Sequence, residues 1–126
     1  MNAAQTPEEL HQDLARAYGA RDLDGLLALF EADATLVLQP GAFARGSGEI
    51  RTALAGFLQL GGVMAVETIE VVPAGDCALT RTFWSIAEAG ETKLSAHGVE
   101  ILHKGEDGRW RFLLDHPFGG DEQARP

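Results

Sequence analysis

Residues 77–116 read CALTRTFWSIAEAGETKLSAHGVEILHKGEDGRWRFLLDH and contain three long runs of strand-forming residues. Two short turns with glycine, at 89–90 and 105–108, separate these runs. Turns of this kind between extended runs are typical of antiparallel hairpins. A similar run precedes them, ending at Pro73-Ala74-Gly75. The pattern therefore predicts four consecutive antiparallel strands, at residues 63–72, 77–87, 92–103 and 109–116.

The N-terminal half has the pattern of three helices and one strand. Thr6 and Pro7 supply a helix cap and a first helical residue, and Gly19 is well placed to end that helix. Asp22 caps a second, shorter helix that reaches Phe30. The remaining elements are a strand at 34–39, a loop at 42–46 and a third helix from 47 to 61. These elements predict an α+β domain.

The predicted strand at 77–87 is apolar on both faces. Leu79 and Phe83 fall on one alternation, whereas Trp84 and Ile86 fall on the other. A strand of this kind needs cover on both sides of its sheet. The helices can cover one side, and a second copy of the chain is the simplest cover for the other. We therefore expect a homodimer through the outer face of the sheet.

Length and charge narrow the class of protein. The 126 residues are enough for one domain, with short tails expected at 1–5 and 121–126. A net charge of −9 argues against nucleic-acid and anionic-membrane partners, which need a basic surface. The single Cys77 cannot form an internal disulfide, and no signal peptide or membrane-spanning run is evident. We expect a cytoplasmic protein.

No metal or cofactor is expected. The four histidines show neither the helical i, i+4 spacing nor the cysteine pairs that mark zinc sites.

Three segments carry a resemblance to a known superfamily. Residues 21–35, RDLDGLLALFEADAT, are similar to the segment that joins the second helix to the first strand in nuclear transport factor 2, ketosteroid isomerase and the SnoaL-type polyketide cyclases. Residues 46–53 resemble the start of the third helix in these proteins. Residues 107–111 resemble the last hairpin of an uncharacterised bacterial branch related to SnoaL. The resemblance implies a cone-shaped, strongly curved antiparallel sheet packed on three N-terminal helices.

The same resemblance argues against steroid isomerisation. Leu14 and Leu38 stand where ketosteroid isomerase has its oxyanion-hole tyrosine and its aspartate base, and Val99 stands at or near its protonated aspartate. Leucine and valine side chains can neither donate nor accept a proton. We therefore do not expect this chain to isomerise steroids by that mechanism.

Asp115 and His116, at the end of the last strand, are the strongest candidates for chemistry. If Lys104 faces Gly108 across the last hairpin, His97 lies opposite Asp115, on a face that continues along Val99 and Leu113. A carboxylate beside an imidazole suits a general base, so Asp115 would be the base and His97 its partner. A slip of one residue instead brings His97 to His116, and the sequence leaves both registers open.

The expected function is that of a small-molecule pocket protein. Its ligand would be apolar and oxygenated, and proton transfer, cyclisation and hydration without a cofactor are the candidate reactions. Tyr18 or Arg81 would orient the ligand, although Glu67 or Glu100 would pair with Arg81 in a purely structural role. The other expected ligand-binding residues are Trp84, Phe57, Leu38, Val99, Leu113 and His116. The alternative is a non-catalytic ligand-binding or dimerisation module whose pocket is filled by side chains.

Overall fold

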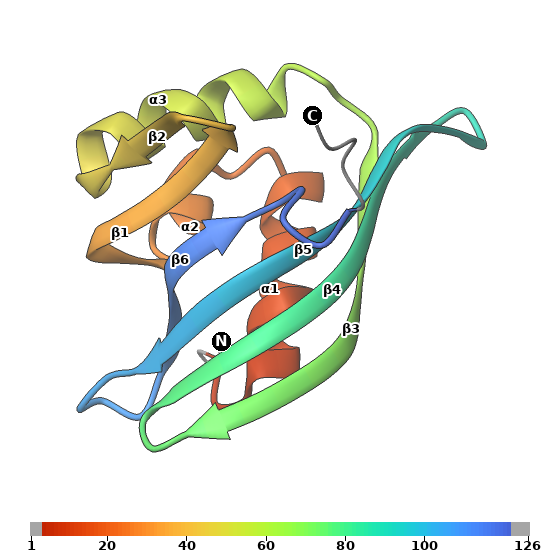
Figure 1. Ribbon diagram of the computed structural model, residues 1–126. Helices are drawn as coiled ribbons and strands as arrows, with labels where there is room; N and C mark the ends of the chain where they lie inside the picture. Colours follow the sequence, from red (N-terminus) through yellow and green to blue (C-terminus); the bar gives the residue numbers. More distant parts are fainter. Residues whose placement is uncertain (1–3, 122–126) are drawn as a thin grey trace.

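A six-stranded, curved sheet forms one layer of the computed structural model, which describes residues 4–121 (Figure 1). The spatial order is β2-β1-β6-β5-β4-β3, and all neighbours are antiparallel except the parallel pair β1 and β6. The predicted meander of the last four strands is confirmed. The strands are β1 (Phe30–Gln39), β2 (Ala42–Arg45), β3 (Val63–Ala74), β4 (Cys77–Glu88), β5 (Glu91–Lys104) and β6 (Trp110–His116).

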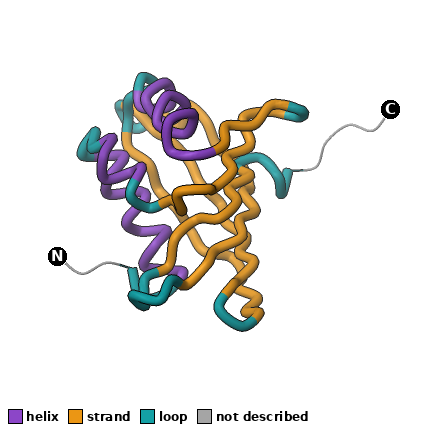
Figure 2. The backbone as a smooth tube through the Cα atoms, turned by 90° about the vertical axis from the view of Figure 1, so that its left-hand side faces the viewer, coloured by secondary structure: helices purple, strands orange, loops and turns teal. Residues whose placement is uncertain are grey.

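Three helices lie on one side of this sheet (Figure 2). They are α1 (Pro7–Gly19), α2 (Leu23–Leu27) and α3 (Gly46–Leu58). The Thr6 hydroxyl accepts a hydrogen bond from the Glu9 amide at 3.1 Å, and the Asp22 carboxylate accepts one from the Gly25 amide at 2.9 Å. Such caps satisfy amides at a helix start that have no partner within the helix. The predicted α+β class is confirmed.

The segment around β1 differs from the prediction in two places. The second helix ends at Leu27, and Phe30 already belongs to β1. Phe30 is part of the strand because it pairs with Phe112 of β6, and the centroids of the two rings lie 5.0 Å apart. The predicted loop at 42–46 is largely strand β2, which folds back on β1 after a turn at Pro40 and Gly41. Both differences depend on strand partners that local sequence patterns do not reveal.

Neither of the two predicted registers of the last hairpin is correct. Lys104 faces Trp110, not Gly108, because the turn between β5 and β6 is wider than expected. A bulge then leaves Leu113 unpaired. Together these features place Asp115 opposite Glu100, three positions along β5 from His97.

The start of the described chain is part of the packed structure. Ala4, expected to belong to a tail, is 4% exposed, and its carbonyl oxygen accepts a hydrogen bond from the Trp110 amide. The other predicted tail residues at 1–3 and 122–126 lie outside the described residues. Within residues 4–121, no helix combines the length and the apolar character needed to cross a bilayer.

Candidate functional site

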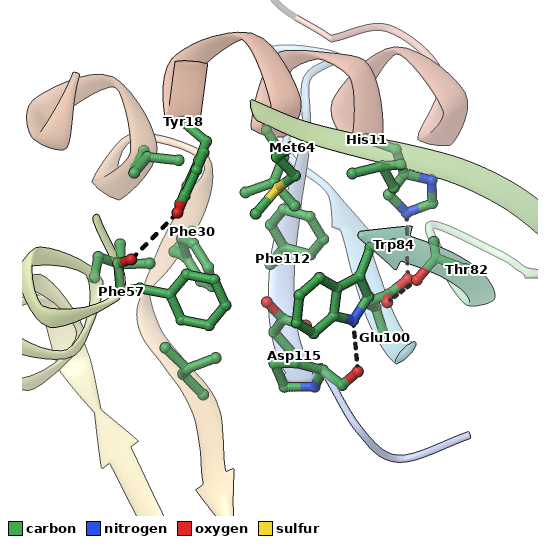
Figure 3. A pocket seen from close by; sticks show the side chains of 16 residues that line it. His11, Tyr18, Phe30, Phe57, Met64, Thr82, Trp84, Glu100, Phe112 and Asp115 are labelled. Carbon is green, nitrogen blue, oxygen red and sulfur yellow. Dashed lines mark hydrogen bonds and ion pairs between the residues drawn. The ribbon is translucent and has the colours of Figure 1, made fainter. Parts of the chain in front are cut away.

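A cavity of about 60 Å³ lies between the helices and the concave face of the sheet (Figure 3). Apolar side chains from all three helices and from four strands form most of its wall, and a few polar groups are set among them. The residues that line it are His11, Leu14, Tyr18, Leu26, Phe30, Leu36, Leu54, Phe57, Met64, Val66, Thr82, Trp84, Glu100, Phe112, Asp115 and Pro117.

Aromatic side chains fix much of the cavity wall. Trp84 contacts Phe57 and Phe118, with ring centroids 5.8 Å and 5.5 Å apart. The indole Nε1–H of Trp84 donates a 2.7 Å hydrogen bond to the Pro117 carbonyl oxygen, which anchors the ring (Figure 3). Packed and hydrogen-bonded aromatic rings keep a pocket in shape without a bound molecule.

Glu100 is held by a set of hydrogen-bond donors at one side of the cavity. It is 4% exposed, and its Oε1 and Oε2 accept hydrogen bonds from the hydroxyls of Thr80 and Thr82, at 2.5 Å and 2.9 Å. The Nε2 atom of His11 lies 3.2 Å from Oε1. A buried carboxylate is tolerated when donors surround it in this way.

Gly98 makes room for this arrangement on β5. A Cβ atom at this position would lie 2.6 Å from Oε2 of Glu100 and 2.7 Å from Oγ1 of Thr82. Carbon atoms do not approach that closely, so the hydrogen bond between Thr82 and Glu100 requires glycine here.

Asp115 lines the same cavity, without the set of hydrogen-bond donors that residues 4–121 provide for Glu100. It is 9% exposed and lies opposite Glu100 on the neighbouring strand, and none of residues 4–121 donates a hydrogen bond to its carboxylate. Burial raises the pKa of Asp115 well above its usual value, and the nearby charge of Glu100 raises it further. An acid of this kind holds its proton where ordinary carboxyl groups have lost it.

Four of the residues predicted to form the site lie in the cavity wall: Tyr18, Phe57, Trp84 and Asp115. Tyr18 contributes its ring, whereas its hydroxyl donates to the Gly61 carbonyl oxygen at 2.8 Å. Burial raises the pKa of the Tyr18 phenol. The Tyr18 hydroxyl therefore donates its hydrogen to the turn that follows α3. The hydroxyl points away from Glu100 and Asp115 (Figure 3).

The predicted pair of His97 and Asp115 is wrong. His97 lies on the outer face of the sheet, where its Nδ1 is 3.2 Å from Asp121 and its ring packs against Phe83. His97 and Glu100 are three positions apart on β5, so their side chains lie on opposite faces of the strand. Asp115 lies opposite Glu100, on the face of the cavity, and not opposite His97.

The other expected ligand-binding residues also lie outside the cavity. Arg81 is on the outer face and pairs with Glu70 at 2.8 Å, and not with Glu67 or Glu100. Leu38 and His116 line a separate surface groove at the end of β1. Val99 and Leu113 are half-buried but are not among the lining residues.

His11, Thr82 and Glu100 were not proposed as site residues from the sequence. His11 lies three and seven residues before Leu14 and Tyr18, which places it on the same buried face of α1. Thr82 shares the alternation of Trp84 on β4. These periodicities are the signal that could have revealed the first two residues. The correct hairpin register is needed for Glu100.

The polar residues do not form a metal site. Among residues 4–121, no group of three or more His, Cys, Asp or Glu side chains is arranged to hold a metal ion.

Several solved structures share this fold. One is described as a putative calcium/calmodulin-dependent protein kinase type II association domain, from Thiobacillus denitrificans. It has a TM-score of 0.75 and 17% identity, over 92% of this chain and 96% of that one. A ketosteroid isomerase-like protein from Erwinia carotovora atroseptica has a TM-score of 0.63 and 23% identity, over 86% and 88%. An NTF2-like protein of unknown function from Pseudomonas putida has a TM-score of 0.67 and 17% identity, over 86% and 80%.

These structural likenesses establish an NTF2-like fold, which agrees with the resemblance seen in the sequence. No curated protein matches the chain. The family model of the SnoaL-like domain matches residues 11–112, from within α1 to within β6. The chain therefore belongs to the SnoaL-like domain family.

Proposed function

We propose that the cavity is an acid–base site for a small, neutral, oxygen-bearing ligand, with Asp115 as its catalytic residue. The observation that carries this proposal is the Asp115 carboxyl group, which is buried, faces an apolar cavity and receives no hydrogen bond from residues 4–121. A carboxyl group that receives no hydrogen bond at the wall of an apolar cavity is available to a ligand there, which would supply the partner.

The chemistry follows from the proton that Asp115 retains. A neutral carboxylic acid donates a hydrogen bond to a carbonyl, ether or hydroxyl oxygen, and it can transfer the proton as negative charge develops there. Asp115 is thus proposed as an acid, whereas the sequence suggested a base. The charge of Glu100 and the apolar walls disfavour carboxylate and phosphate ligands. Proton transfer, cyclisation and hydration remain the candidate reactions.

The second candidate function is a non-catalytic module. The cavity of about 60 Å³ is well below the roughly 300–1,000 Å³ of pockets for drug-sized ligands. Either the ligand is small, or side chains at the wall move to admit it, or the cavity is simply a packing defect beside a polar cluster.

Native mass spectrometry of the freshly purified protein separates these functions. We expect a bound neutral molecule, released and identified on denaturation. A variant with a filled cavity, Leu14→Phe, is the matched control, because Leu14 lines the cavity from a half-buried position on α1 where extra volume causes little strain. Loss of the bound mass in Leu14→Phe would support the site. The same mass on both proteins, or none on the wild type in any neutral ligand mixture, would favour the module.

We further propose that the outer face of the sheet binds a second copy of the chain. Val72, Leu79 and Phe83, on β3 and β4, are 44%, 40% and 36% exposed. Leu79 pairs with Val72 on one side and with Ile101 of β5 on the other. Exposed apolar residues on adjacent strands are typical of an interface. The similar protein from Thiobacillus denitrificans is described as an association domain, which is consistent with this use of the fold.

Leu79→Glu is expected to weaken association at least about tenfold, because it places a charge in the centre of this face. Light scattering coupled to size-exclusion chromatography would then give the mass of a monomer. Leu60→Glu is the control, since Leu60 is 42% exposed but follows α3, outside this face. A wild-type protein that is monomeric at high concentration would contradict the proposal.

A further inference from the structure

His11 is a buried polar residue in the wall of the cavity. It lies on α1 and is 1% exposed. Its Nδ1 is 2.6 Å from the Thr68 hydroxyl of β3, and its Nε2 is 3.2 Å from Oε1 of Glu100. The imidazole therefore bridges α1, β3 and β5 at the side of the cavity. Figure 3 shows His11 beside Glu100.

The contacts of the ring determine which nitrogen faces Glu100 as a donor. A hydroxyl can donate or accept, so Thr68 satisfies Nδ1 in either state of that atom. Nε2 lies 3.4 Å from the Thr80 hydroxyl and 3.2 Å from Oε1 of Glu100. That hydroxyl already donates its hydrogen to Glu100, so both neighbours can only accept from Nε2, and they favour a hydrogen on it. This arrangement holds whether the ring is neutral or carries a charge.

The two acids of the cavity thus differ in their hydrogen bonds. Glu100 accepts hydrogen bonds from Thr80 and Thr82, and Nε2 of His11 lies 3.2 Å from its Oε1. Donors and positive charge beside a carboxyl group favour its charged form. Asp115 accepts no hydrogen bond from residues 4–121. Two neighbouring buried carboxyl groups do not both ionise readily, because their like charges repel. The donors beside Glu100 therefore bear on which of the two acids is protonated.

We propose that His11 is the positioning residue of this site: anchored on Thr68, it contacts Glu100 directly and through the Thr80 hydroxyl, keeps Glu100 as the carboxylate and leaves the proton on Asp115. The inference rests on the proposed role of Asp115 as the acid that meets the ligand. His11 itself acts only through Glu100.

The titratable groups at this site come from three elements, and the hydroxyl donors come from two more. His11 and Tyr18 lie on α1, Glu100 on β5 and Asp115 on β6, and the hydroxyl donors come from β3 and β4. Tyr18 points its hydroxyl at the Gly61 carbonyl oxygen. Within residues 4–121, His11 is the one basic side chain within 4.0 Å of the Glu100 carboxylate.

The test measures the protonation states of Asp115 and Glu100, by ¹³C NMR of the side-chain carboxyl carbons across a pH titration without ligand. In the wild type we expect Asp115 in the acid form and Glu100 in the carboxylate form at neutral pH. In His11→Leu the ratio of protonated Asp115 to protonated Glu100 should fall about tenfold or more. His11→Gln should restore part of this ratio, since its amide can donate to Glu100.

Two further variants keep the test decisive. Thr68→Val keeps the shape of the side chain and removes the hydroxyl that holds the His11 ring. It should therefore shift the ratio in the same direction as His11→Leu. It replaces the His11 variants in the test if both of those fail to fold. His103→Gln is the control, because His103 contacts Glu31 and Asp76 outside the cavity.

The outcomes separate this inference from the proposed function. Unchanged titrations of both acids in folded His11→Leu or Thr68→Val would overturn the role of His11, whatever the cavity binds. A wild-type Glu100 in the acid form would also overturn it. An Asp115 that is ionised at neutral pH in the wild type would instead overturn the proposed acid.

Discussion

Asp115→Asn should abolish proton transfer while leaving the fold intact. The amide has the shape of the protonated acid and still donates a hydrogen bond to a ligand oxygen, but it has no proton to transfer. Ligand binding should therefore persist when turnover is lost. Turnover of any substrate identified from the bound mass, measured beside binding of the same compound, checks this expectation.

The same substitution should change how stability depends on pH. Burial and Glu100 raise the pKa of Asp115, so the folded protein binds a proton that the unfolded chain releases above about pH 3.9. The wild type should therefore lose stability as the pH rises from that value towards the pKa of folded Asp115. Asp115→Asn lacks this dependence, and it should be the more stable protein near pH 8 by about 1–2 kcal/mol.

Urea unfolding at about pH 5 and about pH 8 measures this difference. Asp33→Asn is the control, because Asp33 is exposed on β1 and should leave the pH dependence unchanged. Parallel pH profiles for the wild type and Asp115→Asn would mean that Asp115 ionises as readily in the folded protein as in the unfolded chain. An unfolded Asp115→Asn would mean that the carboxyl group is structural.

Gly98→Ala is expected to destabilise the protein by about 1–3 kcal/mol. The new methyl group would lie 2.6 Å from Oε2 of Glu100 and 2.7 Å from Oγ1 of Thr82. Both side chains can move, but their movement breaks the 2.9 Å hydrogen bond between them and leaves a buried charge with fewer donors. Chemical denaturation gives the change in the free energy of unfolding.

Gly56→Ala is the matched control for this substitution. Gly56 lies on the exposed side of α3, and a Cβ atom there meets nothing within 4 Å. Alanine should stabilise that helix by up to about 1 kcal/mol. If Gly98→Ala were as stable as the wild type, the carboxylate of Glu100 would not lie over Gly98.

The parts of the fold that local sequence determines were predictable. Thr6 and Asp22 cap their helices as their residue types indicate, because a cap involves only the next few residues. The four-strand meander was predictable for the same reason, since each turn is short and contains glycine. Strand β2 and the early start of β1 were not, because their hydrogen bonds come from distant strands.

The site was harder to predict than the fold, because it depends on one register. The turn from Gly105 to Arg109 and the bulge at Leu113 together displace Asp115 from His97 to Glu100. Side-chain alternation repeats every two residues, so a turn of the wrong length or an unseen bulge changes both the partner and the face. Asp115 could thus be proposed from its residue type and position, whereas its partner could not.

The position of β6 has a consequence for how the chain folds. This strand is the last to be synthesised, yet it lies in the middle of the sheet, and it joins the β1–β2 pair to the β3–β5 meander. Until residues 110–116 leave the ribosome, β1 lacks its parallel neighbour and Glu100 lacks the strand that brings Asp115 beside it. Contacts between distant residues form slowly. Completion of the sheet and closure of the cavity should therefore be one late, cooperative event that waits for β6.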